Sequence, residues 1–229
     1  MRISEGHIHE VVLDASGKAA VRVTCPQRAI PSPGRYTLAW SPDDTDASLA
    51  APLFPAEISE HGFLAGSPVP HSWEPGTALV LNGPLGHGFS IPKTIRHLLL
   101  IALGESFSRL IPFIRLSLDR NAAVALFTDC ALPLLPTAVE VYPLLDLPGA
   151  LSWADFIGID LPIDALDSLR PYLGLQPGSE LPCQAQVLIY SHMPCGGTAE
   201  CCACAVPGKR KTKLSCKDGP VFDLQDLKW

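Results

Sequence analysis

Short apolar stretches, broken by turn residues, fill the first part of the chain. At Tyr36, Leu38 and Trp40 the large side chains recur at every second position, which is the pattern of a β-strand with one buried face. Clusters of Gly, Pro, Asp and Ser separate the stretches. The predicted strands are His7–Leu13, Ala19–Thr24, Gly34–Trp40, Pro52–Ile58 and Thr77–Asn82. Strands of this length and spacing predict a small antiparallel β-barrel or sandwich.

The pattern changes at about Arg96, where strands and helices begin to alternate. His97–Leu103 is a continuous apolar run, as expected of a parallel strand that is covered on both faces. Apolar positions at helical spacing follow from Phe107 to Leu118, with Ser106 placed to cap that helix. Further strands are predicted at Ala122–Thr128, Val139–Tyr142, Asp155–Ile159 and Gln186–Tyr190, and a second helix at Ile163–Leu173. This alternation predicts a Rossmann-like α/β domain with a mostly parallel sheet.

Composition limits the classes of function. The net charge is −6 at pH 7, without the basic surplus that phosphate neutralisation requires, so we expect no nucleic-acid partner. No apolar run approaches the roughly 18 residues that span a membrane. The first residues also lack the apolar core of a signal peptide. We therefore expect a cytoplasmic protein with no membrane span that acts on a small molecule or another protein.

Cysteines gather near the C-terminal end of the sequence. Five of the eight stand between His192 and Lys217, whereas Cys25, Cys130 and Cys183 are scattered and are expected at ordinary apolar positions. Clustering in a sequence without an export signal indicates metal binding rather than a disulfide framework. The chain thus divides into a barrel at residues 1–93, an α/β domain at 94–191 and a metal-binding module at 192–229.

Four of the clustered cysteines have nearly the spacing of a plant-type iron-sulfur site. The set is Cys195, Cys201, Cys204 and Cys216. The gaps are five, two and eleven residues, where plant-type [2Fe-2S] sites have gaps of four and two between the first three ligands. Gly196 and Gly197 allow the backbone to fold closely around inorganic sulfide. The pattern therefore predicts a [2Fe-2S] cluster.

The identity of the second ligand, and of the metal, is less constrained. Cys202 is adjacent to Cys201, and we choose Cys201 because a two-residue gap lets its thiolate converge with that of Cys204. A structural four-cysteine zinc site uses the same ligands and remains an alternative.

Two motifs around these cysteines resemble a known family. Met193-Pro-Cys-Gly-Gly197 and Cys216-Lys-Asp-Gly-Pro-Val-Phe222 are similar to the iron-sulfur cluster binding domain of the electron-transfer subunit of dihydroorotate dehydrogenase, within the ferredoxin-reductase-like family. The resemblance implies an FAD-binding barrel, a nicotinamide-binding α/β domain and a C-terminal [2Fe-2S] module, in that order. It also implies a partner, the flavoprotein catalytic subunit, in which any dihydroorotate chemistry would reside.

The resemblance assigns flavin contacts to the glycine-rich turn that closes the barrel. Its residues are Gly83, Pro84, Leu85, Gly86, His87 and Gly88. A solvated loop is the alternative for His87. The family's flavin anchor is an arginine followed, after two residues, by serine or threonine, and Ala51 and Phe54 stand at those positions here. Alanine cannot supply the charge that pairs with the flavin pyrophosphate.

The nicotinamide-binding turn also departs from the family pattern. Several glycines are expected after the first strand of the α/β domain, so that phosphate can approach the helix N-terminus. Here Gly104 stands alone and Glu105 would repel a phosphate. NAD binding by the usual route is therefore not expected.

Three functions remain open from the sequence. The first is an electron-transfer subunit with FAD and a [2Fe-2S] cluster that passes electrons between a reduced nicotinamide or flavin and a dihydroorotate dehydrogenase-type flavoprotein. The second is an iron-sulfur relay or structural subunit that has lost FAD and NADH binding. The third is a four-cysteine zinc interaction module. The basic run Lys209–Lys213 is either a solvated hairpin or a patch that docks an acidic partner.

Overall fold

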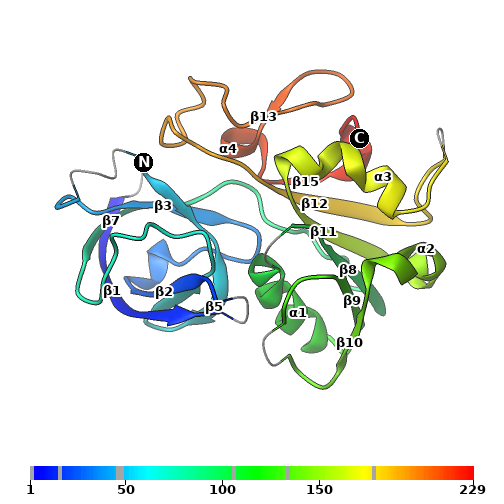
Figure 1. Ribbon diagram of the computed structural model, residues 1–229, viewed down its shortest axis with the longest axis horizontal. Coiled ribbons are helices and arrows are strands. Elements are labelled where there is room, and N and C mark those ends of the chain that lie inside the picture. The colour runs from blue at the N-terminus through cyan, green and yellow to red at the C-terminus, as the bar shows by residue number, and fades with distance from the viewer. Residues whose placement is uncertain (1–2, 15–16, 45–48, 105–106, 133–134, 177–178) are drawn as a thin grey trace.

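The structure is a computed structural model that describes residues 3–14, 17–44, 49–104, 107–132, 135–176 and 179–229. A seven-stranded antiparallel sheet forms the first part (Figure 1). Its strands are β1 (Ile3–Leu13), β2 (Ala19–Thr24), β3 (Tyr36–Trp40), β4 (Ala51–Leu53), β5 (Pro55–Ser59), β6 (Gly62–Ala65) and β7 (Ala78–Leu85). Their order is β4-β3-β7-β1-β2-β6-β5. Because Phe54 alone separates the two edge strands, the continuous chain closes the sheet into the predicted barrel.

Two details of the barrel differ from the sequence pattern. The predicted strand Pro52–Ile58 is split at Phe54, because β4 pairs with β3 whereas β5 pairs with β6. Strand β6 was not predicted, since its four residues are too few for a period-two pattern to stand out. The predicted burial of Tyr36 and Leu38 is confirmed, but these two side chains pack in a cluster with residues of the C-terminal module, whereas Ala39 packs in the barrel core.

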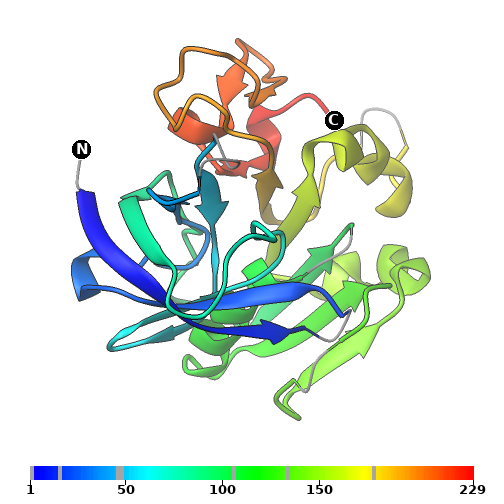
Figure 2. The ribbon, with the colours of Figure 1, turned by 60° about the vertical axis from the view of Figure 1, so that its left-hand side comes forward.

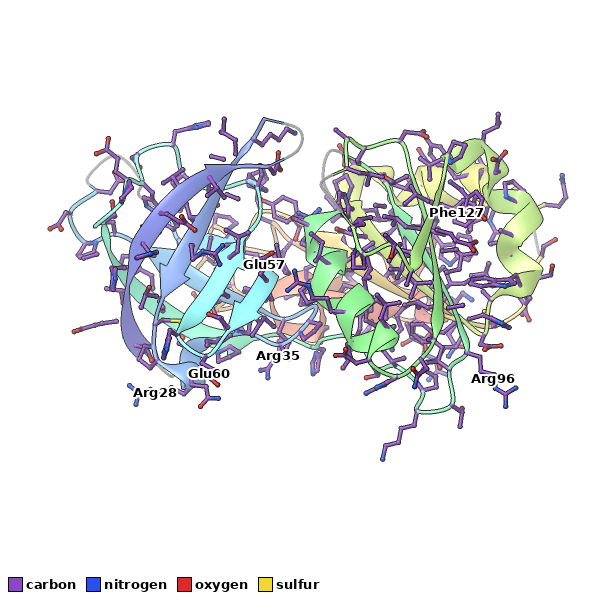
Figure 3. All side chains as sticks on the ribbon, turned by 90° about the horizontal axis from the view of Figure 1, so that it is seen from below. Arg28, Arg35, Glu57, Glu60, Arg96 and Phe127 are labelled. Atoms are coloured by element: carbon purple, nitrogen blue, oxygen red, sulfur yellow. The ribbon has the colours of Figure 1, made fainter. Side chains whose placement is uncertain are left out.

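A six-stranded sheet forms the second part (Figure 3, where Phe127 marks β9). Its order is β10 (Val139–Tyr142), β9 (Ala123–Thr128), β8 (His97–Ala102), β11 (Phe156–Pro162), β12 (Gln184–Tyr190) and β15 (Val221–Asp223). The first five strands are parallel and β15 is antiparallel. Apolar side chains fill both faces of the sheet, as the continuous apolar run at β8 predicts.

Short helices cover the two faces of this sheet. Helix α1 (Ile111–Leu118) packs on one face beside the barrel, and α2 (Leu147–Ala150) and α3 (Leu169–Tyr172) lie on the other (Figure 1). Both predicted helices begin as 3₁₀ turns, at Ser108–Leu110 and at Ile163–Ser168, so the α-helical parts are shorter than predicted. The predicted cap Ser106 lies outside the described residues.

The C-terminal segment packs on both larger units. It contains β13 (Ala205–Val206), β14 (Lys213–Leu214) and α4 (Ser215–Asp218), and it ends beside the sheet through β15. Figure 2 shows this segment, in orange and red, across the top of the molecule. Residues beyond 192 therefore complete the α/β sheet as well as carrying the clustered cysteines. No helix of the described residues is long and apolar enough to cross a membrane.

Candidate metal centre

The four predicted thiols lie where the C-terminal segment meets the barrel and β12. Cys195 and Cys201 lie in the loop after β12, Cys204 precedes β13 and Cys216 lies in α4. The Cys204 and Cys216 residues are only 1% and 6% exposed, because Tyr36, Leu38, Leu188, Met193 and Val221 pack in the same cluster. Cys201 is exposed and Cys195 is half-buried. The site thus has a closed side against the barrel and an open side at Cys201.

The thiols meet in two pairs. Cys201 donates a hydrogen bond to Cys195, and Cys204 and Cys216 hydrogen bond with each other. Cys195 also interacts electrostatically with Cys216, so the two pairs are neighbours. Among the described residues, however, no three His, Cys, Asp or Glu side chains converge on a point that could hold one metal ion. Two adjacent pairs are compatible with a binuclear cluster, in which each iron takes two cysteines.

Backbone amides of the loop point at these sulfurs. The Ala203 N–H lies 3.4 Å from Cys201 Sγ, the amides of Glu200 and Cys201 donate to Cys195, and Ala199 N–H donates to Cys216. The loop turns inward through left-handed residues, with φ of 63° at Gly196, 81° at Gly197 and 66° at Ala199. Amides directed at sulfur are the groups that tune an iron-sulfur centre.

The same contacts bias the ionisation of the thiols. Burial opposes ionisation of Cys195, but hydrogen bonds from the Cys201 and Glu200 amides and from the Thr198 hydroxyl outweigh it and lower its pKa to about 6. Burial and the neighbouring Cys204 thiol raise the pKa of Cys216 to about 12. The Ser215 hydroxyl next to it is fully buried and has no hydrogen-bond partner in the described structure, so it can donate to a bound group. The residues present therefore fit a [2Fe-2S] cluster.

Cys202 is set apart from the four thiols. It adopts a left-handed φ of 56°, is exposed, and enters none of the thiol interactions described above. The other cysteines lie elsewhere: Cys25 is in the barrel core, Cys130 donates to the Gly104 carbonyl and Cys183 packs at the edge of the α/β core. All eight are free thiols.

The glycine-rich turn lies against the cysteine segment. The His87 amide donates to the Gly219 carbonyl at 2.7 Å, and its Nδ1 lies 3.3 Å from the Asp218 carbonyl oxygen. A Cβ on Gly86 would lie 2.5 Å from Pro220 Cδ, and φ there is 74°. The glycines therefore allow close approach of protein to protein, and they position the segment that carries Cys216.

Two side chains outside the predicted set hold this contact together. Arg35 Nε donates to the Gly86 carbonyl and Nη2 to the Pro84 carbonyl, each at 3.0 Å. The Tyr36 hydroxyl donates to the Cys216 carbonyl at 3.0 Å, and burial, with the nearby thiols, raises the Tyr36 pKa. The alternation in Tyr36 and Leu38 indicated burial, but no sequence signal showed which surface they would face.

Aromatic rings fill the joint between barrel and α/β domain at the predicted flavin anchor. Phe54 is 4% exposed, with its ring centroid 5.6 Å from that of Tyr36 and 6.2 Å from that of Tyr190. The Arg109 guanidinium lies 4.9 Å from the Tyr190 centroid and 6.0 Å from that of Phe54. Arg109 Nε donates to both carboxylate oxygens of Asp160, at 2.9 and 3.0 Å. The described anchor positions, Ala51 and Phe54, therefore supply neither a cation nor a hydroxyl, and the joint does not fit the flavin that the resemblance implies.

The start of the first α/β helix is covered as well. A 3₁₀ turn at Ser108–Leu110 precedes α1, and no side chain of the described residues caps either that turn or α1. A Cβ on Gly66 of the barrel would lie 2.1 Å from Ser108 Oγ, so barrel backbone sits against this turn. Glu105, predicted to repel phosphate, lies outside the described residues.

The basic run borders a cavity of about 1210 Å³. Lys213 Nζ lies 2.8 Å from an Asp226 carboxylate oxygen, while Lys209, Arg210 and Lys211 are exposed and line the cavity. Trp229 also lines the cavity, with the Arg170 guanidinium 4.3 Å from its ring centroid.

Residues 191–228 match the family model described as the iron-sulfur cluster binding domain of dihydroorotate dehydrogenase B. The C-terminal segment is an iron-sulfur cluster binding domain of that type. The match covers the whole cysteine set and the β15 strand, and it confirms the predicted resemblance over this part of the chain. A comparison with curated protein sequences finds no match.

Solved structures place the rest of the chain in the ferredoxin-reductase-like fold. An NADH-dependent reduced ferredoxin-NADP oxidoreductase is 17% identical, with a TM-score of 0.77 over 98% of this chain and 90% of that chain. The ferredoxin reductase in carbazole 1,9a-dioxygenase is 18% identical, with a TM-score of 0.60 over 76% of this chain and 65% of that one. The flavohem-like FAD/NAD binding domain of nitric oxide dioxygenase from Vibrio cholerae O1 biovar El Tor is 12% identical, with a TM-score of 0.54 over 82% and 98%. These likenesses confirm the predicted fold.

Proposed function

We propose that the chain is an electron-transfer subunit whose [2Fe-2S] cluster is held by Cys195, Cys201, Cys204 and Cys216. The arrangement of these thiols as two adjacent pairs, within the segment that matches the iron-sulfur family model, carries the proposal. When bound, such a cluster accepts and releases single electrons. The chain's own residues hold the thiolates, direct amides at the sulfurs and, through Tyr36 and Leu38, exclude water from the barrel side.

We further propose that the partner is a flavoprotein catalytic subunit of the dihydroorotate dehydrogenase type. The family of the C-terminal domain supports this assignment. The exposed side of the site, at Cys201, is the side from which a partner can approach. The exposed basic residues Lys209, Arg210 and Lys211 lie between the third and fourth cysteines, where they would attract an acidic surface of that partner.

Spectroscopy of the aerobically purified protein tests the cluster. We expect broad visible iron-sulfur absorption and about two irons and about two sulfides per chain. A colourless protein with stoichiometric zinc would establish the zinc module instead.

Paired serine variants test the ligand set. Cys204→Ser removes a buried member of one thiol pair and is expected to abolish cluster assembly, whereas Cys202→Ser, which alters an exposed thiol outside the pairs, is expected to retain it. Iron and sulfide content of the two variants is the measurement. Normal content in Cys204→Ser, or loss in Cys202→Ser, would overturn the assignment.

A further inference from the structure

We infer that the joint between the barrel and the α/β domain is sealed by protein side chains, so that the chain holds no FAD and the cluster is its sole redox group. The inference rests on the proposed function for the cluster alone. The sealing itself rests on the shape, the charge and the backbone contacts of the joint.

The shape of the joint excludes a flavin ring at the anchor strand. Phe54 stands at the single break between β4 and β5, where the barrel closes, and its side chain leaves the barrel core for the joint. There its ring contacts those of Tyr36 and Tyr190, one from the barrel and one from the end of β12. Tyr36 is fully buried and Phe54 is nearly so. A planar three-ring group against this strand would have to displace both rings from a close-packed cluster.

The arginines described at the joint already have protein partners. A dinucleotide brings a pyrophosphate, which proteins bind with arginine or with free backbone amides. Ala51 offers no charge. Arg109 is 7% exposed, and both of its Asp160 contacts are to a carboxylate that is fully buried. Arg35, which contacts the glycine-rich turn, donates from Nε and Nη2 to carbonyls of that turn.

The backbone of the joint is occupied in the same way. The His87 amide is bonded to Gly219, and the space beside Gly86 is filled by Pro220. At the nucleotide turn, Gly66 of the barrel lies against Ser108. At these glycines, the close contact that a ligand could otherwise make is therefore made by residues of the same chain.

Sealing changes the electron count of the protein. A chain with one [2Fe-2S] cluster takes up about one electron, whereas the cluster with FAD would take up about three, since a flavin accepts two. NADH alone would not reduce the sealed protein, because hydride transfer requires a two-electron acceptor. Electrons must then enter and leave through the exposed side of the cluster site at Cys201.

Anaerobic titration of the purified holoprotein with dithionite tests the inference. We expect uptake of about one electron per chain, bleaching of the iron-sulfur absorption, no flavin released by acid and no reduction by NADH. Stoichiometric flavin, uptake of about three electrons, or saturable binding of added FAD would overturn the inference while leaving the cluster in place. Absence of iron and sulfide would instead overturn the proposed function. The release of flavin by acid and the binding of added FAD would still show whether the joint is sealed.

Thermal melting with added FAD provides a second readout, because a ligand that binds only the folded state raises the Tm. We expect no shift for the wild type. The Ala51→Arg/Phe54→Ser variant restores the charge and removes the ring, and a shift confined to it would support exclusion by these two positions. If FAD raises the Tm of neither protein, the Arg109–Asp160 pair and the glycine-rich turn are sufficient to exclude FAD. A shift in the wild type contradicts the inference.

Discussion

Replacement of Arg109 by methionine tests the ion pair at the centre of the joint. Asp160 is fully buried, and its carboxylate receives both of its described hydrogen bonds from Arg109 Nε, at 2.9 and 3.0 Å. Methionine keeps much of the side-chain volume but leaves the carboxyl without its cation. Removal of one partner of a buried pair costs about 3–5 kcal/mol. Loss of the cation–π contacts with Tyr190 and Phe54 adds about 0.5–2 kcal/mol.

The cost should depend on pH. Burial raises the pKa of Asp160 against the opposing effect of Arg109, so without Arg109 the pKa rises further. A carboxyl with a folded-state pKa above its unfolded value binds more protons when folded. It therefore contributes stability that is fully present below the unfolded pKa and is lost as the pH rises through the folded pKa. The stability deficit of Arg109→Met is thus expected to be larger at about pH 8 than at about pH 5.5.

Urea unfolding followed by circular dichroism measures the deficit at both pH values, with the wild type at each pH as the reference. A deficit of about 3–5 kcal/mol corresponds to a Tm lowered by roughly 6–20 °C for a chain of this size. The double variant Arg109→Met/Asp160→Leu removes both charges and should be more stable than Arg109→Met. If the double variant is no more stable than the single one, or if the deficit is independent of pH, the buried charge is not the cause.

Two further perturbations test the docking of the cysteine segment and of the partner. Gly86→Ala places a Cβ 2.5 Å from Pro220 Cδ at a φ of 74°, and it should lower the free energy of unfolding by about 1–3 kcal/mol and reduce the iron content. The control is Gly76→Ala, which has a φ of 94° but open space around the Cβ. Equal losses of stability and iron in the two variants would refute the packing argument. The Lys209→Glu/Lys211→Glu variant should bind the catalytic subunit more weakly in calorimetry, with the largest effect at low salt, whereas the control Lys93→Glu should bind normally. A loss of affinity that does not depend on salt, or that is equal in the control, would argue against electrostatic docking.

Regular patterns in the sequence were sufficient for most of the fold. The alternation around Tyr36 and the apolar run at His97 each predict a strand, because burial of one or both faces dictates which side chains stand there. Strand β6 was missed because four residues carry little pattern. The two helices were predicted too long, since 3₁₀ and α turns place apolar residues at similar intervals. The cysteine spacing predicted the cluster domain, and the family match confirms that domain.

The contacts across the joint could not be predicted in the same way. Ala51 and Phe54 showed only that the expected flavin anchor is absent at these two positions. The side chains that fill the joint include Arg109, Asp160 and Tyr190, which come from three separate elements. No local sequence pattern shows that these residues meet. The glycine-rich turn likewise has the sequence of a ligand-binding loop, although its neighbours are Pro33 and Pro220 of the same chain.

The arrangement of the joint explains how the fold could persist without a nucleotide in it. In a two-domain fold of this kind, the surfaces that face each other must be covered, or their apolar and charged groups are exposed at a cost. Here Phe54 and Tyr190 cover the apolar part, and Asp160 neutralises Arg109. The same cluster continues to Tyr36, whose hydroxyl holds the Cys216 carbonyl. The side chains that seal the joint therefore also fix one wall of the metal centre, so that selection for a rigid cluster site would retain the barrel and the α/β domain as its scaffold.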